Sequence, residues 1–361
     1  MNKNGEAEKK QDYRVEKDSI GTKDVPQNVY YGVQSLRAAE NFHITGLNMH
    51  PEIINSLAYI KKAAAITNCE IGMLDKKKAK AIVQACDEIL EGKLHGDFIV
   101  DPIQGGAGTS LNMNANEVIA NRAIEILGGE KGDYSIINPN DDVNCGQSTN
   151  DVIPTAGKMT SLRLLKNLKK ELLRLHKALC AKAKEFDHVI KMGRTQMQDA
   201  VPIRLGQEFN AYSVAVMRDI HRMDRAMEEM CTLNMGGTAV GTGINADEAY
   251  LRRIVPNLVE VSDMEFVQAY DLIDATQNLD PFVAVSGAVK ACAVTLSKIA
   301  NDLRLMSSGP RAGFGEINLP AKQNGSSIMP GKVNPVIPEV VNQVAFNVIG
   351  NDVTITMAAE A

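Results

Sequence analysis

Four short stretches gather the side chains that could bind and react with a small molecule. They are GGAGTSLNMNANE (105–117), CGQSTNDVIPT (145–155), GRTQMQDAVP (193–202) and GSSIMPGKVNP (325–335). We expect each to precede a helix, the last with Asn334 as N-cap and Pro335 at the first helical position. Helix N-termini carry free N–H groups and a partial positive charge, and Thr, Ser, Asn, Gln, Lys and Arg donate hydrogen bonds, so together the stretches favour a site for a small dianion. Any one of them alone is better explained as a capped, solvent-exposed loop.

The fourth stretch ends a long segment without helical or strand periodicity. Residues 307–334 carry five glycines, among them Gly309, Gly313, Gly315 and Gly325, and a loop of this length in a compact protein is usually functional or disordered. We expect a flexible lid. GSSIMPGKV is not a phosphate-binding GxxxxGK[ST] loop, because five residues separate its glycines and Val333 stands in place of Ser or Thr. The motif therefore gives no support for a nucleotide.

The elements that must position these side chains are long helices. In three segments, apolar residues recur every three or four positions, which is typical of helices in a near-antiparallel bundle. The segments are 162–186, 205–230 and 282–306. A fourth helix is expected after Pro335. The sequence predicts a mainly α fold with an N-terminal, mostly helical domain over 1–145, which includes a short β-hairpin around Gly21, and a helical bundle domain over 146–361.

Composition excludes several classes of function. The net charge of −5 and the pI near 5.8 give no broad surface for nucleic acid, and no uninterrupted apolar run approaches the roughly 18 residues of a membrane span. The six cysteines are scattered without CxxC spacing, which favours reduced thiols and a cytoplasmic location over disulfides. The six histidines form no paired ligand motif, so no metal site is indicated.

The second and third polar stretches lie far apart, because one long helix separates them. The second stretch starts one long helix, and the third follows the end of that helix about 35 residues later. At 1.5 Å per residue the two stretches are roughly 50 Å apart. If both serve one small substrate, several copies of the chain must build the site.

The four stretches together resemble the signature blocks of the fumarase/aspartase superfamily. The similarity runs from Tyr13 to Ala361, and GGAGTSLNMNANEVIAN, GRTQMQDAVP and PEVVNQVAFNVIGNDVTITMAAEA are most similar to its aspartase branch. The resemblance implies a homotetramer with active sites shared between subunits, and reversible elimination of ammonia from L-aspartate to give fumarate without an organic cofactor. It implies that a divalent cation activates some members. It also implies that the family's last bundle helix and C-terminal domain are absent from this chain.

The resemblance further implies a role for each site residue. Removing a Cβ proton beside a carboxylate creates an aci-carboxylate dianion, which fixed donors must stabilise. Ser326 is then the general base, activated as an oxyanion by backbone N–H groups and Lys332, with Ser327 as a rival that sequence alone does not separate from it. The other family-matched residues are Thr109, Ser148 and Thr149 for the β-carboxylate, Asn150 for the amino group, and Thr195, Lys332 and Asn334 for the α-carboxylate.

Gln196, which we place among the substrate-binding residues, is a departure from the fumarase pattern. That pattern has His here, oriented by an acid such as Glu339, and Gln196 takes up no proton. A class II fumarate hydratase and an inactive fragment of the superfamily are the alternatives to the expected lyase. Asn138, Asn140 and Asp141 match a secondary anion site of fumarases.

Overall fold

The computed structural model describes residues 12–361, which form two compact units. The first 11 residues of the predicted N-terminal domain lie outside the described residues. The first unit consists of the chain up to Ser161 together with Cys231–Gln277, and the second of Leu162–Met230 together with Asn278–Ala361. These units differ from the predicted division at residue 145, because the start of one long helix and the segment 231–277 pack with the N-terminal helices.

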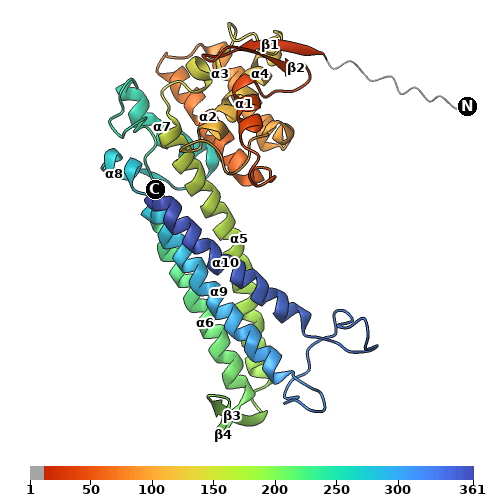
Figure 1. Cartoon of the computed structure of the whole chain (residues 1–361). Coiled ribbons are helices and arrows are strands. Elements are labelled where there is room, and N and C mark those ends of the chain that lie inside the picture. Colours follow the sequence, from red (N-terminus) through yellow and green to blue (C-terminus); the bar gives the residue numbers. More distant parts are fainter. Residues whose placement is uncertain (1–11) are drawn as a thin grey trace, which may run out of the picture. The chain divides into compact units, whose positions relative to one another are not determined.

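The first unit is mostly helical, with two small sheets. Its elements are β1 (Tyr13–Lys17), β2 (Thr22–Pro26), α1 (Val33–Asn41), α2 (Pro51–Glu70), α3 (Lys76–Leu90), the 3₁₀ turn η1 (His95–Asp97), α4 (Thr109–Ile126), the π-helical turn η2 (Pro139–Val143), the start of α5 (Thr149–Glu185), β5 (Thr232–Leu233), α7 (Glu248–Ser262), β6 (Val267–Gln268) and α8 (Leu272–Gln277) (Figure 1). Strands β1 and β2 form an antiparallel hairpin, and β5 pairs with β6 in parallel. The hairpin predicted around Gly21 is confirmed.

Side chains near the helix ends determine where these helices begin. Asp75 accepts hydrogen bonds from two backbone N–H groups in the first turn of α3, and Asp247 accepts one in the first turn of α7. Helix α1 has no such cap in its own sequence. Instead, Glu117 of α4 accepts from three backbone N–H groups at the start of α1. These bonds satisfy free donors and join α1 to α4.

The core of the first unit lies between five helices. Helix α2 packs against α3 and α7, and α4 packs against α3 and α1. The apolar side chains buried there include Leu57, Ile60, Ile82, Ile119 and Ile124. This core holds the start of α4, which lies within the first polar stretch.

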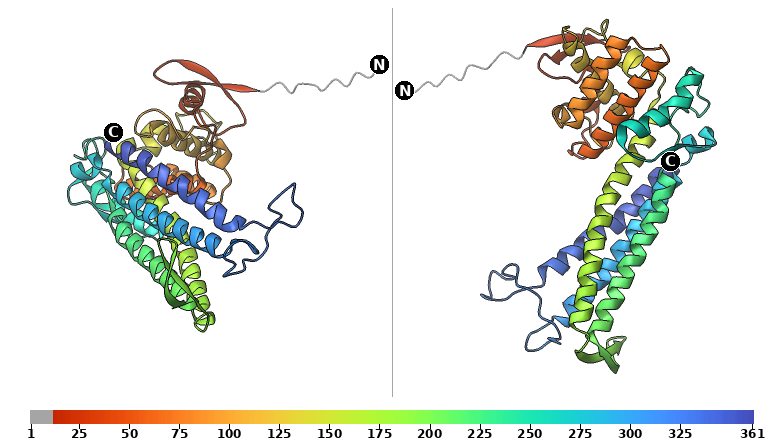
Figure 2. Two further views of the ribbon diagram at one scale, coloured as in Figure 1. Left: turned by 60° about the horizontal axis from the view of Figure 1, so that its bottom comes forward. Right: turned by 180° about the vertical axis from the view of Figure 1, so that it is seen from behind.

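The second unit is a bundle of long helices. Its elements are the rest of α5, β3 (Ile190–Thr195), β4 (Gln198–Arg204), α6 (Leu205–Met230), α9 (Asp280–Met306) and α10 (Val336–Glu360). Helix α9 packs against both α6 and α10, and both figures show these three helices side by side (Figures 1 and 2). The predicted mainly α fold with a long-helix bundle is confirmed.

The predicted apolar periodicity accounts for the packing of this bundle. On α6 the buried positions include Phe209, Val216 and Met223, and on α9 they include Val285 and Cys292. Within each helix these residues are seven positions apart, which is about two turns, so they lie on one face. By length and composition α9 could also cross a membrane, and it is the one helix among residues 12–361 that meets this criterion. A helix in the core of a bundle meets the same criterion of length and composition.

Candidate functional site

Two of the four polar stretches lie in the first unit, where each opens a helix. Thr109 is the first residue of α4 and follows Gly108, whose φ of 86° is left-handed. Thr149 is the first residue of α5. A Cβ atom on Gly108 would lie 3.0 Å from the Ile153 side chain, so the residue before α4 closely approaches the first turn of α5. The structure therefore brings together the starts of α4 and α5.

The start of α5 is tied to a glycine-rich turn by a buried carboxylate. Asp151 Oδ1 accepts from the Ser148 backbone N–H at 2.9 Å, and Oδ2 accepts from the N–H groups of Gly236 and Thr238 at 3.1 Å each. Burial raises the pKa of Asp151 to about 6, although these three N–H groups act in the opposite direction. The carboxylate thus holds the Ser148–Asn150 segment against residues 236–238.

Asn150 has a fixed amide orientation. Its Nδ2 donates to the Ala239 carbonyl at 2.7 Å, and Asn234 Nδ2 donates to the Asn150 carbonyl at 2.9 Å. With Nδ2 engaged, Asn150 Oδ1 is the end of the amide that accepts no hydrogen bond from the described residues. A free carbonyl oxygen at this position can accept a hydrogen bond from an ammonium group.

The third polar stretch forms a β-hairpin, which the sequence did not predict, and α6 begins at Leu205 directly after the second strand. Thr195 at the end of β3 pairs with Gln198 at the start of β4, and Gln196 and Met197 form the two-residue turn. Both turn residues have positive φ, 51° and 64°, as a type I′ turn requires. Thr195 and Gln196 are solvent-exposed.

The fourth polar stretch is a closed loop that carries three site residues. The Gly325 N–H donates to the Lys332 carbonyl at 2.8 Å, and Asn334 Nδ2 donates to the Gly325 carbonyl at 3.1 Å. Asn334 is therefore not the N-cap of α10, as its sequence position suggested. The helix starts one residue later, after Pro335, and has no side-chain cap.

Within this loop, Ser326 and Ser327 have different surroundings. Ser326 Oγ accepts from the backbone N–H groups of Ile328 at 3.3 Å and Met329 at 3.1 Å. Ser326 is half-buried and Ser327 is exposed. Two N–H groups directed at one oxygen stabilise negative charge on it, so the geometry distinguishes the two serines that the sequence left open.

The long loop before this stretch is attached to β3. Glu316 accepts from both terminal nitrogens of Arg194, one of them at 3.1 Å, and lies 3.2 Å from Lys191 Nζ. The Phe314 ring lies under the Arg194 guanidinium, 4.2 Å from its carbon. Arg194 directly precedes Thr195, so this cluster places the loop beside the β3–β4 hairpin.

A cavity of about 920 Å³ lies in the second unit beside this loop. Its lining includes Lys332 and Asn334 from the loop, Met197 from the hairpin turn, and Arg304 and Glu339 from the ends of α9 and α10. Arg304 and Glu339 are 3.9 Å apart. The structure thus groups Lys332 with Asn334, while Ser326, Thr195 and Gln196 are not among the residues that line this cavity.

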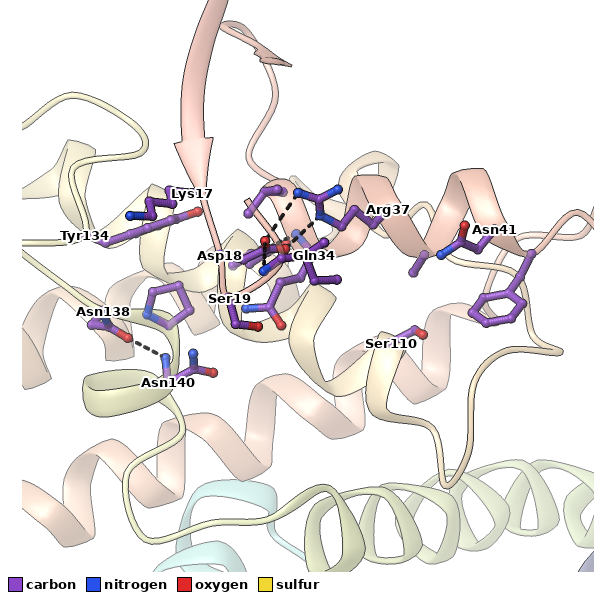
Figure 3. A pocket seen from close by; sticks show the side chains of 16 residues that line it. Lys17, Asp18, Ser19, Gln34, Arg37, Asn41, Ser110, Tyr134, Asn138 and Asn140 are labelled. Carbon is purple, nitrogen blue, oxygen red and sulfur yellow. Dashed lines mark hydrogen bonds and ion pairs between the residues drawn. The ribbon is translucent and has the colours of Figure 1, made fainter. Parts of the chain in front are cut away.

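A second pocket of about 430 Å³ contains part of the predicted secondary anion site (Figure 3). Asn138 and Asn140 line it, and Asn138 Oδ1 accepts from the Asn140 backbone N–H at 2.8 Å. Asp18 and Arg37 form an ion pair on the other side of the pocket. Asp141 is not part of the lining.

Three residues near the start of α5 were not predicted: Lys61, Asn112 and Asn144. Lys61 Nζ donates to Asn144 Oδ1 at 2.8 Å, and Asn112 Nδ2 lies 3.4 Å from Thr149 Oγ1. They belong to segments far apart in the sequence, which local patterns do not connect. The available signals were a lysine inside the apolar run AYIKKAAAI and the asparagines repeated in NMNAN.

Residues that could bind a metal ion were sought among the described residues. Among residues 12–361 there is no group of three or more His, Cys, Asp or Glu side chains placed to hold a metal ion. The six cysteines are all free thiols.

A comparison with known sequences finds close relatives. A protein-family model described as lyase matches residues 21–350. The chain is 59% identical over 350 residues to an aspartate ammonia-lyase of Bacillus subtilis (strain 168), covering 97% of this chain and 74% of the relative. It is 51% identical to the aspartate ammonia-lyase of Escherichia coli (strain K12), covering 96% of this chain and 73% of the relative.

A comparison with solved structures finds the same fold. A structure described as fumarate lyase:delta crystallin from Brucella melitensis bound to cobalt has a TM-score of 0.94 and 53% identity, and the match covers 97% of this chain and 76% of that one. A recombinant class II fumarase from Schistosoma mansoni has a TM-score of 0.93 at 37% identity, covering 96% and 76% of the two chains.

Proposed function

We propose a reaction mechanism and an assembly for this chain, which belongs to the aspartate ammonia-lyases of the fumarase/aspartase superfamily. It is a carbon–nitrogen lyase that converts L-aspartate reversibly to fumarate and ammonia. The observation that carries this assignment is the 51–59% identity to aspartate ammonia-lyases over nearly the whole chain. The similarity to a class II fumarase is weaker, at 37% identity.

The proposed elimination uses Ser326 as the base. Its oxyanion removes a proton from Cβ, and the β-carboxylate becomes an aci-carboxylate with a second negative charge. The electron pair then returns, the Cα–N bond breaks, and ammonia leaves with the electrons of that bond, so that fumarate keeps two negative charges. An unperturbed serine is a very poor base, and the N–H groups of Ile328 and Met329 on its oxygen support this role.

The two ends of the substrate require different residues. We propose that Thr109, Ser148 and Thr149 hold the β-carboxylate at the starts of α4 and α5, where helix N-termini favour negative charge. The free Asn150 Oδ1 accepts from the substrate ammonium. The α-carboxylate is bound by a second group of residues, in which Lys332 supplies the positive charge. The group consists of Thr195, Gln196, Lys332 and Asn334.

The proposed site combines residues from different copies of the chain in a homotetramer. Helix α5 has 37 residues, so its ends are about 55 Å apart. Ser148–Asn150 adjoin one end and Thr195 follows the other, which is too far for one small substrate. Exposed apolar side chains on α10 support an assembly, because large unpaired apolar surfaces mark protein interfaces. They are Ile337 (55% exposed), Val340 (51%), Val344 (58%), Phe346 (63%), Val353 (65%) and Met357 (62%).

We also propose that the enzyme is cytoplasmic and that its reaction uses no organic cofactor. The six free thiols support a reducing compartment. The chemistry needs only a base, hydrogen-bond donors that stabilise the aci-carboxylate, and binding sites for the two carboxylates. The protein's own residues supply all of these. Activation by a divalent cation would be an addition to this scheme and not a step in it.

The assignment is tested by following fumarate absorbance with the purified protein. We expect fumarate to form from L-aspartate, with negligible formation from L-malate, because Gln196 replaces the histidine of the fumarase pattern. Turnover of L-malate at a rate comparable to that of L-aspartate would make the protein a fumarase instead. Absence of turnover with both substrates would support the inactive alternative.

A further inference from the structure

Lys61 is a fully buried lysine without an ion pair. It lies in the middle of α2 with none of its surface exposed, and it forms no salt bridge with any described residue. Its Nζ donates to two amide oxygens, Asn144 Oδ1 at 2.8 Å and Gln147 Oε1 at 2.9 Å. A charged group is costly to bury, and no hydrogen bond to a carboxylate offsets the cost here; the direct partners are these two neutral acceptors, and Asp151 acts only through its charge. Such a position calls for an explanation beyond packing.

Asn144 connects Lys61 to the candidate site. Asn144 Oδ1 also accepts from Asn112 Nδ2 and Asn116 Nδ2, each at 3.2 Å. Asn112 Nδ2 is in turn 3.4 Å from Thr149 Oγ1, a long hydrogen bond of the kind that catalytic sites without substrate often show. A continuous path of hydrogen bonds therefore runs from Lys61 to Thr149.

The amide orientations along this path are set by Lys61. Asn112 Oδ1 and Asn116 Oδ1 are buried and have no hydrogen-bond partner, so neither amide is oriented by its own oxygen. Both instead direct their NH₂ groups at Asn144 Oδ1. That oxygen stays in place because Lys61 Nζ donates to it, and the amine has enough hydrogens to donate to both Asn144 and Gln147 in its charged and its neutral form.

The orientation of Asn112 decides which group Thr149 can bind. When Asn112 donates to Thr149 Oγ1, the threonine hydroxyl proton is free to donate to a carboxylate. With the amide reversed, the hydroxyl would donate to Asn112 and present a lone pair to the substrate. Only the first arrangement stabilises negative charge on the substrate.

Lys61 also fixes the backbone before Thr149. Gln147 Oε1 accepts from Lys61, and Gln147 Nε2 donates to the carbonyls of Val143 at 3.0 Å and Cys145 at 3.2 Å. Asn144 Nδ2 donates to the Gln147 carbonyl at 3.1 Å. The segment that leads into Ser148 and Thr149 is therefore tied to one buried amine.

We propose that Lys61 is a positioning residue for the elimination: through Asn144 and Asn112 it makes the Thr149 hydroxyl a donor to the substrate's β-carboxylate as that group gains its second negative charge. The inference rests on the proposed function of Thr149. It assigns to Lys61 an effect on the transition state that is larger than its effect on substrate binding, because the charge increases only during the reaction.

Lys158 provides a matched control. It is also a buried lysine of the first unit, 3% exposed, and its Nζ donates to the Thr232 carbonyl at 2.6 Å. It lies nine residues after Thr149 on α5, outside the path described above. Lys61→Met and Lys158→Met thus each remove a buried amine, but only the first interrupts the path to Thr149.

The test compares two inhibitors of L-aspartate turnover. Succinate has an ordinary carboxylate at the β position, whereas the nitronate of 2-amino-3-nitropropanoate has two negatively charged oxygens on a planar group, like the aci-carboxylate. Inhibition constants do not depend on the fraction of correctly folded protein. We expect Lys61→Met to raise the inhibition constant of the nitronate about 10- to 100-fold and that of succinate less than about threefold. The kcat for L-aspartate should fall more than KM rises.

The control variant and the outcomes that would overturn the proposal give different patterns of inhibition. Lys158→Met should leave both inhibition constants unchanged. Equal weakening of both inhibitors by Lys61→Met, or no weakening, would overturn the proposal. If Lys61→Met does not fold, Asn112→Leu tests the same path, since it removes the donor to Thr149 and keeps the shape, and it should show the same selective loss. Absence of fumarate formation by the unmodified protein would refute the proposed function instead.

Discussion

Ser326 shows how an ordinary residue type becomes a candidate base. A serine hydroxyl is a poor base near neutral pH, and the sequence alone did not separate Ser326 from Ser327. The structure distinguishes them because only the Ser326 oxygen faces two backbone N–H groups. These donors stabilise an alkoxide without moving during the reaction.

Replacing Ser326 tests its role against its neighbour. Ser326→Ala should lower kcat by about 10²–10⁴-fold, the usual contribution of a general base. Ser327→Ala, at an exposed position in the same loop, should cost clearly less. Steady-state rates of fumarate formation by both folded variants give the comparison. Near-normal turnover by Ser326→Ala would exclude it as the base.

Lys61 should also make the stability of the protein depend on pH. Burial lowers its pKa to about 7, against attraction by the charge of Asp151 that raises it. The unfolded chain therefore binds more protons than the folded chain between pH 7 and the usual lysine pKa, and stability increases with pH in that window. The other groups that face Lys61 do not titrate there, because the pKa of Asp151 is about 6 and burial raises the pKa of Cys86 far above this range.

Thermal unfolding at several pH values measures this effect. From pH 7 to 9.5 the free energy of unfolding should rise more for the unmodified protein than for Lys61→Met, by at most about 1.4 kcal/mol per pH unit. Both proteins share every other titrating group, so the difference isolates Lys61. Parallel pH dependence of the two proteins would mean that Lys61 is not a titrating group in this range.

The loop from Gly325 to Asn334 holds three of the proposed site residues in one conformation. A Cβ atom on Gly325 would lie 2.7 Å from the Asn334 backbone nitrogen and would also clash with its side chain. The close approach of these two residues allows the hydrogen bond from Asn334 to Gly325. Glycine is required at this position because a side chain would clash with Asn334, and not because the backbone has a left-handed φ.

Gly325→Ala should therefore reduce activity without unfolding the bundle. Displacing Asn334 by a few tenths of an ångström or more would misplace one of the proposed ligands of the α-carboxylate, and we expect kcat/KM to fall about 10- to 100-fold. Gly96→Ala is the control, because a Cβ atom there meets nothing within 4 Å. Unchanged kcat/KM in Gly325→Ala would show that the loop adapts.

The elements differ in how far the sequence predicted them. The bundle helices α6 and α9 follow directly from apolar residues spaced by three and four, since each buries one face. Hairpin β3–β4 was missed because its turn residues are Gln196 and Met197, which lack the Asn-Gly signal of such turns. The site residues came from motif resemblance, whereas Lys61 and Asn112 needed the three-dimensional structure, because their partners lie 83 and 37 residues away.

The proposed active site requires more than one copy of the chain. The proposed β-carboxylate ligands and the proposed base lie in different units, and the exposed apolar residues of α10 offer a surface for other copies. If tetramers share their sites as proposed, Thr149 and Ser326 of one working site belong to different chains. This is the central claim, and it is independent of which carboxylic acid is the substrate.

Subunit mixing tests this claim most directly. Thr149→Ala and Ser326→Ala proteins should each be nearly inactive, because every site carries one lesion. After the two are denatured together in equal amounts and refolded, about a quarter of the sites should contain both intact residues, since half of the copies supply each one. We predict recovery of about a quarter of the unmodified L-aspartate turnover. Mixed assemblies that are confirmed by mass and still inactive would place both residues in one chain and contradict the account.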